Sequence, residues 1–112
     1  MSKSQDNFKR GTAEMLILHL LQNEDLYGYQ ITKLFSEKSK NLYTMVEGPL
    51  YPILFRLVDS GYISSYEKLV GPKRKRRYYH LEDNGKIYYH ELLNSFDEIC
   101  LGINRILDRT NE

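Results

Sequence analysis

The sequence predicts a mainly helical domain that carries one small β-hairpin and ends in a long helix. Three observations support this prediction. Apolar residues recur at helical spacing in four segments, two β-prone segments flank a Gly-Pro turn, and the last segment keeps its helical spacing for about 25 residues. With 112 residues, 41% of them hydrophobic and 28% charged, the chain has the size and composition of one globular domain.

The start of the chain and its cysteine content indicate where the protein works. Residues 1–7 are polar and contain no apolar signal sequence. No apolar run approaches the roughly 20 residues that span a bilayer. Cys100 is the single cysteine, so an internal disulfide is excluded and a reducing compartment suits the chain. We therefore expect a cytoplasmic protein.

The first part of the chain predicts two helices. Residues 8–22 are apolar almost all the way round, so we expect one mostly buried helix there, with Thr12 as an alternative inner start. Residues 23–25 form a polar break. Apolar residues at i, i+4, i+7 and i+8 then predict a second helix over about residues 27–38. Gly28 lies in its first turn, where it allows another helix to approach closely.

The segment 47–61 predicts a short third helix that begins abruptly. Gly48 permits an unusual backbone angle, and we expect Pro49 and Pro52 in the first turn, where backbone N–H groups have no intrahelical partner. Apolar residues then form one stripe at helical spacing: Leu50, Ile53, Leu54, Leu57 and Val58. Gly61 follows the stripe at the position of a left-handed C-terminal cap.

Two β-prone segments, 62–70 and 76–81, predict a hairpin directly after this helix. Residues 71–75 join them with a Gly-Pro turn followed by positive charge. Side chains alternate between the two faces of a strand, so Tyr79 and Leu81 share one face, which we expect to pack inward.

From about residue 82 to Asp108 the chain predicts one long helix. Apolar residues follow each other at spacings of 3, 4, 3, 4 and 3, which is a heptad pattern. A helix of about 25 residues is roughly 37 Å long, too long for three short helices and a hairpin to cover. We therefore expect the stripe to pair with a second copy of the chain; packing inside its own subunit is the alternative. The predicted interface contains Leu92, Leu93, Phe96, Ile99, Cys100, Ile103 and Ile106.

The order of these elements is typical of a winged helix-turn-helix, with the third helix as recognition helix and the hairpin as wing. Positive charge is concentrated in the part of the chain that contains these elements. Residues 1–81 hold 13 Lys/Arg and 8 Asp/Glu, and residues 82–112 hold 3 and 7, which together make the chain's 16 and 15. We expect residues 1–81 to bind DNA and residues 82–112 to form the dimerisation helix of the same structural unit.

Candidate DNA contacts lie on the hairpin and on the third helix. Five consecutive cations on the hairpin can follow phosphates: Lys73, Arg74, Lys75, Arg76 and Arg77. Tyr51 falls off the apolar stripe and can reach a phosphate with its hydroxyl or a thymine methyl group with its ring. As a core residue, Tyr51 would instead need a buried hydrogen-bond partner. Arg56 suits a phosphate or a guanine edge, and Gly48 and Pro49 lie at the start of the helix.

The residue inventory argues against an enzyme. The chain contains no nucleophile elbow, phosphate-binding Gly-rich loop or His-Glu-x-x-His motif, so no catalytic residue is predicted. Its histidines and cysteine lack metal-site spacing, and we predict no metal and no cofactor. The main alternative to DNA binding is a winged-helix module that docks a partner protein, with the wing cations on an acidic surface.

Several of these segments together resemble the PadR-like transcriptional regulators, the short group with a single C-terminal helix. The similarity covers about residues 8–107 and includes five segments: Thr12–Leu18, Tyr27–Ile31, Glu47–Leu57, Gly61–Ser64 and Arg76–Leu81. The resemblance implies a repressor that dimerises through its last helix and binds double-stranded operator DNA with an inverted repeat. Tyr51 and the wing match DNA-contacting positions of that family. Pro49 departs from the Thr or Ser often found there, so base preference does not carry over in detail.

The resemblance also implies an effector site. Some members of the family bind flat aromatic or cationic compounds between the two long helices of the dimer. Phe96 falls where drug-binding members place a central aromatic residue, often Trp. We therefore expect a small aromatic or cationic effector near Phe96, Tyr89 and Asp97, although no acidic residue matches every drug-contacting position. The alternative role of Phe96 is to fill the interface.

Overall fold

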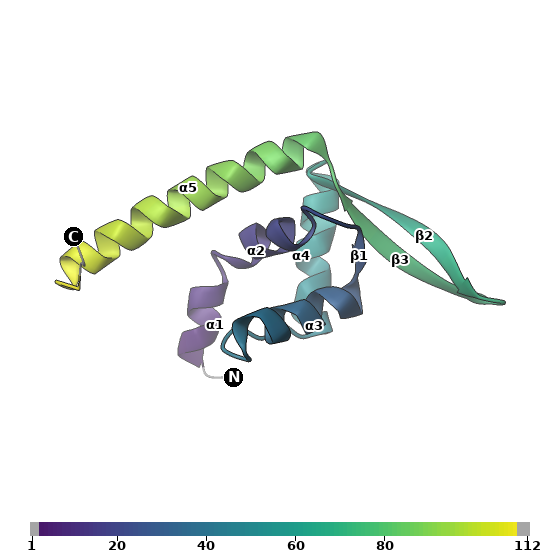
Figure 1. Cartoon of the computed structure of the whole chain (residues 1–112), viewed down its shortest axis with the longest axis horizontal. Helices are drawn as coiled ribbons and strands as arrows, with labels where there is room; N and C mark the ends of the chain where they lie inside the picture. Colours follow the sequence, from purple (N-terminus) through teal and green to yellow (C-terminus); the bar gives the residue numbers. More distant parts are fainter. Residues whose placement is uncertain (1–2, 110–112) are drawn as a thin grey trace.

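A computed structural model describes residues 3–109 of the chain, and it confirms the winged helix-turn-helix with a long C-terminal helix (Figure 1). The elements are, in order, α1 Lys3–Lys9, α2 Ala13–Leu20, β1 Leu26–Tyr27, α3 Gly28–Ser39, α4 Glu47–Asp59, β2 Ile63–Gly71, β3 Arg74–Leu81 and α5 Asp83–Ile106. Helices α2, α3 and α4 form the body. The β2–β3 hairpin, which we call the wing, projects from one end of it, and α5 extends toward the other.

The helix predicted over residues 8–22 is interrupted. Its first two residues end α1, which otherwise covers part of the polar leader, and the remainder contains α2. A turn at residues 10–12 separates α1 from α2, and the Thr12 N–H donates to the Lys9 carbonyl at 3.0 Å to close it. Gly11 explains the break, because glycine is a poor helix former and nothing packs on it here. The alternative start at Thr12 is close to the structure, since α2 begins at Ala13. The Thr12 hydroxyl bonds to the Tyr43 hydroxyl at 2.8 Å and does not cap the helix.

A short strand precedes α3 where the sequence predicts the start of a helix. Residues 26–27 pair antiparallel with β3, with Leu26 opposite Tyr79 and Tyr27 opposite Tyr78, so the sheet order is β1-β3-β2. Helix α3 begins one residue later than predicted, at Gly28. Residues 26–27 form a strand because they pair with the free edge of β3. Nothing in the sequence near these residues indicates that pairing, so the strand was not predicted.

Helix α4 begins at Glu47, and two predictions about its start are wrong. Gly48 has an ordinary helical backbone angle, because Gly61 is the one glycine of the described chain with a positive φ. Pro49 lies in the first turn as expected, but Pro52 is the sixth residue of the helix and lies beyond that turn. Without an N–H, Pro52 cannot donate to the carbonyl of Gly48, so this helical bond is missing.

The C-terminal end of α4 is capped as the sequence predicts. Gly61 has φ of 77°, in the left-handed region that favours glycine. The Tyr62 N–H donates to the Leu57 carbonyl at 3.0 Å, and the Gly61 N–H donates to the Val58 carbonyl at 2.9 Å. This pair of bonds is the Schellman motif, which stops the helix and turns the chain directly into the wing.

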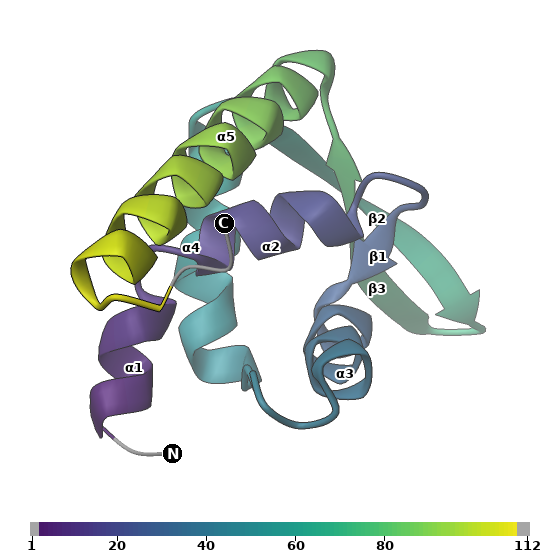
Figure 2. The same ribbon diagram turned by 60° about the vertical axis from the view of Figure 1, so that its left-hand side comes forward.

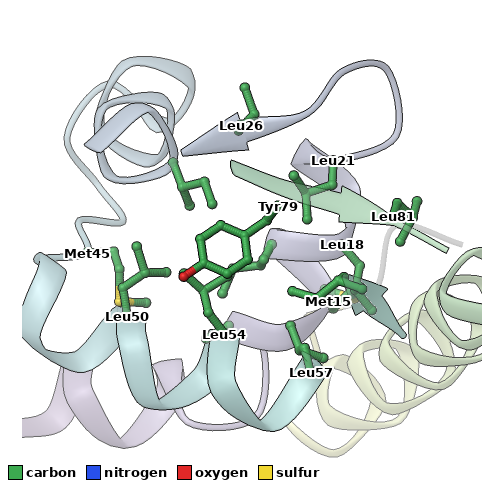
Figure 3. Close-up of a cluster of buried hydrophobic side chains, with 14 of the residues drawn as sticks. Met15, Leu18, Leu21, Leu26, Met45, Leu50, Leu54, Leu57, Tyr79 and Leu81 are labelled. Atoms are coloured by element: carbon green, nitrogen blue, oxygen red, sulfur yellow. The ribbon is translucent and has the colours of Figure 1, made fainter. Parts of the chain in front are cut away.

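The hydrophobic core lies between α4, α2 and the base of the sheet (Figure 3). Leu50, Leu54 and Leu57 form the buried face of α4 and are at most 1% exposed. Tyr79 and Leu81 of β3 pack against this core, which confirms the prediction that their face of the strand points inward.

The N-terminal half of α5 packs on α2, but its C-terminal half is largely uncovered. Tyr89 is buried, and its hydroxyl lies 2.6 Å from Nδ1 of His19. Farther along, Phe96 is 39% exposed, Ile99 64%, Ile103 48% and Ile106 82%. The body is therefore too short to cover the apolar stripe, as the predicted length of the helix implies.

Candidate nucleic-acid interface

A cleft of about 560 Å³ lies where the N-terminal ends of α3 and α4 meet the wing. The N-terminal end of α3, a helix of 12 residues, lies at this cleft, and the free backbone N–H groups of a helix N-terminus attract anions. We call this the wing cleft, and its lining residues are Tyr27, Gly28, Tyr29, Glu47, Tyr51, Arg74, Lys75, Arg76 and Arg77.

The wing cleft brings together most of the predicted DNA contacts. Tyr51 and four of the five wing cations line it, although they are more than 20 residues apart in sequence. Lys73 lies outside it, in the two-residue turn at the tip of the wing. Gly48 and Pro49 are exposed at the start of α4 but do not line the cleft.

Sequence reasoning missed the other residues of the cleft. Tyr27, Tyr29 and Glu47 line it but were not predicted as contacts. Gly28, in the first turn of α3, was the one indication in the sequence that another group comes close at this point. A Cβ at Gly28 would lie 2.6 Å from the Tyr51 hydroxyl. The close approach that this glycine allows is therefore made by the side chain of Tyr51.

The Tyr51 side chain is placed to donate a hydrogen bond. It is 45% exposed, so it is not a core tyrosine, and its hydroxyl lies 3.4 Å from Oε2 of Glu47. Partial burial, followed by the nearby Glu47 carboxylate, raises the pKa of Tyr51. The hydroxyl therefore stays protonated at neutral pH and can exchange Glu47 for a phosphate oxygen.

Aromatic side chains in edge-to-face and stacked contact hold cations on the outer face of the wing. The Tyr78 ring lies 5.5 Å from Tyr27 and 5.8 Å from Tyr66, measured between centroids. The Arg76 guanidinium lies 4.0 Å from the centre of the Tyr27 ring, and Lys68 Nζ lies 5.6 Å from that of Tyr78. Such contacts limit the positions of Arg76, which orders one edge of the wing cleft.

Polar contacts fix the base of the wing to the body. Asp25 accepts a hydrogen bond from the Tyr66 hydroxyl at 2.6 Å and lies 2.7 Å from Nδ1 of His80. Burial alone would raise the pKa of Asp25, but these bonds and the charge of His80 outweigh it and keep the pKa below its usual value. Across the strands, Arg77 pairs with Glu67 at 3.3 Å.

Arg56 lies on the other flank of α4. Five residues of helix separate it from Tyr51, which places the two side chains about 140° apart. Its Nε is 3.9 Å from Oε1 of Glu14, and Oε2 of the same carboxylate accepts a hydrogen bond from the Tyr88 hydroxyl. The Arg56 side chain is 60% exposed and faces α2, a position that favours a phosphate contact over a guanine edge.

A second cleft, about 940 Å³ and strongly apolar, is lined mainly by residues of α1, α2 and α5. Figure 2 shows how these three helices lie relative to one another. We call it the apolar cleft. Phe8, Met15 and Leu16 line one side. The α5 side contains every predicted dimer residue except Ile106, together with Tyr89. Of the three residues predicted for the effector site, Phe96 and Tyr89 line this cleft and Asp97 does not.

The described residues contain neither a cluster of metal-ligating side chains nor a membrane-spanning helix. Within residues 3–109 there is no group of three or more His, Cys, Asp or Glu side chains that could hold a metal ion. None of the helices in this range is long and apolar enough to cross a membrane.

Known proteins share both the sequence pattern and this fold. The chain matches the transcriptional regulator PadR-like family over residues 17–91. The negative transcriptional regulator PadR of Bacillus subtilis is 35% identical over 77 residues, which are 69% of this chain and 42% of that protein. An uncharacterized protein X of Lysinibacillus sphaericus is 33% identical over 90 residues, 80% of this chain and 83% of the relative.

Solved structures support the same assignment. A transcriptional regulator from Clostridium thermocellum superposes with a TM-score of 0.82 at 33% identity, covering 94% of this chain and 96% of that one. Bacillus subtilis PadR in complex with operator DNA superposes with a TM-score of 0.68 at 33% identity, covering 72% and 46%. The chain therefore belongs to the PadR-like family of DNA-binding transcriptional regulators, a family of regulators and not of enzymes.

Proposed function

We propose that the protein is a homodimeric repressor that binds an inverted-repeat operator. Residues 1–81 bind DNA, with α4 in the major groove and the wing on the flanking backbone, and residues 82–112 join the two copies. The observation that carries the proposal is the wing cleft, where Tyr51 and four cations lie next to the start of α4. Repression of chromosomal genes places the protein in the cytoplasm.

The proposed partner in the dimer is the α5 stripe of a second copy. An exposed stripe that combines Phe96, Ile99, Ile103 and Ile106 on one helix leaves a large apolar surface in water. The apolar cleft beside it continues this surface onto α1 and α2. A symmetric pair formed here would present two α4 helices to successive major grooves about 34 Å apart.

The DNA-binding part is tested by fluorescence anisotropy with the protein's own promoter and a scrambled duplex. A dimer that neutralises about 6–10 phosphates should lose about 10³–10⁵ in affinity between 50 and 200 mM salt. Preference for the promoter should reach about 10³ or more. Because each cation contributes about one counterion, changing Lys73, Arg74 and Lys75 to glutamine should lower the salt slope by about three per subunit.

A control for the loss of a positive charge away from the wing is Lys86→Gln on α5, where the lysine pairs with Asp83 at 3.7 Å. This variant should keep the wild-type salt slope. Absence of DNA binding even at 50 mM salt would contradict the proposal and favour a winged-helix module that docks a protein. Tight binding without sequence preference would contradict the repressor part alone.

We further propose that the apolar cleft holds a small aromatic effector that changes the separation of the two DNA-binding heads. Phe96, Tyr89 and His19 offer ring faces or edges to a planar ligand. Lys9 is the one Lys, Arg, Asp or Glu among the described lining residues. The charge of the cleft therefore favours a neutral or anionic aromatic over the cationic compound that the resemblance also implies.

Two dyes of opposite charge test this effector site. The anionic dye 1-anilinonaphthalene-8-sulfonate should bind more tightly than the cationic dye acridine orange, and Phe96→Ala should weaken its binding by about tenfold. That factor corresponds to about 1.4 kcal/mol, the upper range for one aromatic contact. Fluorescence titration of the tryptophan-free protein gives both affinities. Exclusive binding of the cation, or equal binding by the Phe96→Ala variant, would refute the assignment.

A further inference from the structure

The outward face of α4 carries an exposed phenylalanine and no cation. Gly48, Pro52, Phe55 and Asp59 follow each other at spacings of four, three and four, so they form one strip along the helix. All four residues are exposed, and they lie away from the buried face formed by Leu50, Leu54 and Leu57. We call this set of four the outer strip.

Phe55 has no structural role that explains its position. It is 71% exposed, the highest value among the large apolar residues of α4, and it lies outside the packed core. Substituting this side chain should therefore not disturb the fold. An exposed phenyl ring on the face of a recognition helix instead indicates a contact with another molecule.

Apart from Asp59, at the C-terminal end of the outer strip, the charged groups of α4 lie on its flanks. Tyr51 and the wing cations are on one flank, around the wing cleft, and Arg56 is on the other flank beside Glu14. Phosphates run along both edges of a major groove, whereas base edges lie at its floor. A helix with polar contacts at both flanks, and with Pro52 and Phe55 between them, matches this arrangement.

The floor of the major groove offers one apolar group, the 5-methyl group of thymine. Phe55 cannot donate or accept a hydrogen bond, so it cannot read the polar edges of guanine, cytosine or adenine. Pro52, one turn away, adds a second apolar surface without a backbone N–H. We infer that Phe55 contacts a thymine methyl group and selects an A·T pair at one position of each half-site.

This inference rests on the proposed DNA-binding function, and the experiment separates the two. The protein first selects its preferred duplexes from a library with 20 random base pairs. Each thymine of the selected duplex is then replaced by deoxyuridine, which removes only the methyl group. At one position per half-site, the substitution should lower wild-type affinity by about fourfold, the effect of one apolar carbon.

Two variants assign the effect to a residue. Phe55→Ala should bind the thymine duplex more weakly and should no longer distinguish it from the deoxyuridine duplex. Tyr51→Ala, the matched aromatic control on the flank of the same helix, should bind more weakly but keep the fourfold difference. Thermal melting and sedimentation of both variants should show the wild-type fold and assembly, since both side chains are exposed.

Results that differ from these expectations would refute either DNA recognition by the protein or the thymine contact of Phe55. Failure to enrich any sequence from the library would refute DNA recognition itself. Sequence-specific binding in which Phe55→Ala keeps the full response to deoxyuridine would refute the inference and leave the proposed function intact. An affinity for DNA that Phe55→Ala does not change would place Phe55 outside the groove, where a partner protein becomes its occupant.

Discussion

Changing Ile99 to aspartate is expected to convert the proposed dimer into monomers and to reduce operator affinity by at least about 10³. Ile99 lies at the centre of the α5 stripe and lines the apolar cleft. The variant would bury an unpaired carboxylate in each subunit, and an unpaired buried charge costs several kcal/mol. A monomer would retain one head and lose every contact to the second half-site. Analytical ultracentrifugation reports the assembly, and anisotropy with operator DNA reports the affinity.

Ile87→Asp is the matched control for this variant. Ile87 is 63% exposed and Ile99 is 64% exposed, both on α5, so the two changes add the same charge at equal exposure. The twelve residues between them turn the helix by about 120° beyond full turns, and Ile87 does not line the apolar cleft. Ile87→Asp should remain dimeric. A dimer that survives Ile99→Asp would show that the copies meet elsewhere.

Changing Gly85 to alanine is expected to cause a larger loss of stability than the same change at any other glycine of the chain. A Cβ at this position would collide with the carbonyl oxygen of Tyr62 and lie 2.8 Å from Cδ1 of Leu81. Both are held firmly, because the Tyr62 carbonyl accepts a hydrogen bond from the Glu82 N–H and Leu81 is in the core. Overpacking of this kind costs about 1–3 kcal/mol or more.

Thermal unfolding measures the effect of Gly85→Ala. A loss of about 1–3 kcal/mol should lower Tm by roughly 4–20 °C in a domain of this size. Gly48→Ala is the control, because no atom lies within 4 Å of its Cβ and alanine is the better helix former. Its Tm should stay the same or rise slightly. An unchanged Tm for Gly85→Ala would mean that α5 can move away from the wing without loss.

The local sequence pattern predicted those elements whose buried face follows from the spacing of their own apolar residues. The apolar stripe of α4, the cap at Gly61 and the inward face of β3 could all be predicted from the sequence, because each depends on residues close together in the chain. The break between α1 and α2 and the short strand that begins at Leu26 could not be predicted from the local sequence. The break is set by one glycine without packing, and the strand is set by an edge of β3 more than 50 residues away in sequence.

The candidate site divides in the same way. The wing cations and Tyr51 stand out by charge and by their place off a stripe, whereas Tyr27 and Glu47 reach the wing cleft only through the packing of α3 and α4. Gly85 is the clearest case. Glycine at the start of a helix has several possible reasons, and the contact with Tyr62 becomes visible only when the wing and α5 are placed together.

The junction between the wing and α5 has a consequence for the evolution of such regulators. Glu82 is the single residue between the last residue of β3 and the first of α5, and its backbone is bonded to the base of the wing. An inserted residue there would turn the following helix by about 100° and advance it by about 1.5 Å. The two heads of the proposed dimer would then face different sides of the double helix. One insertion or deletion at this point would therefore give a descendant new operator spacing with every base-reading residue as inherited, provided that a glycine again lies against the Tyr62 carbonyl.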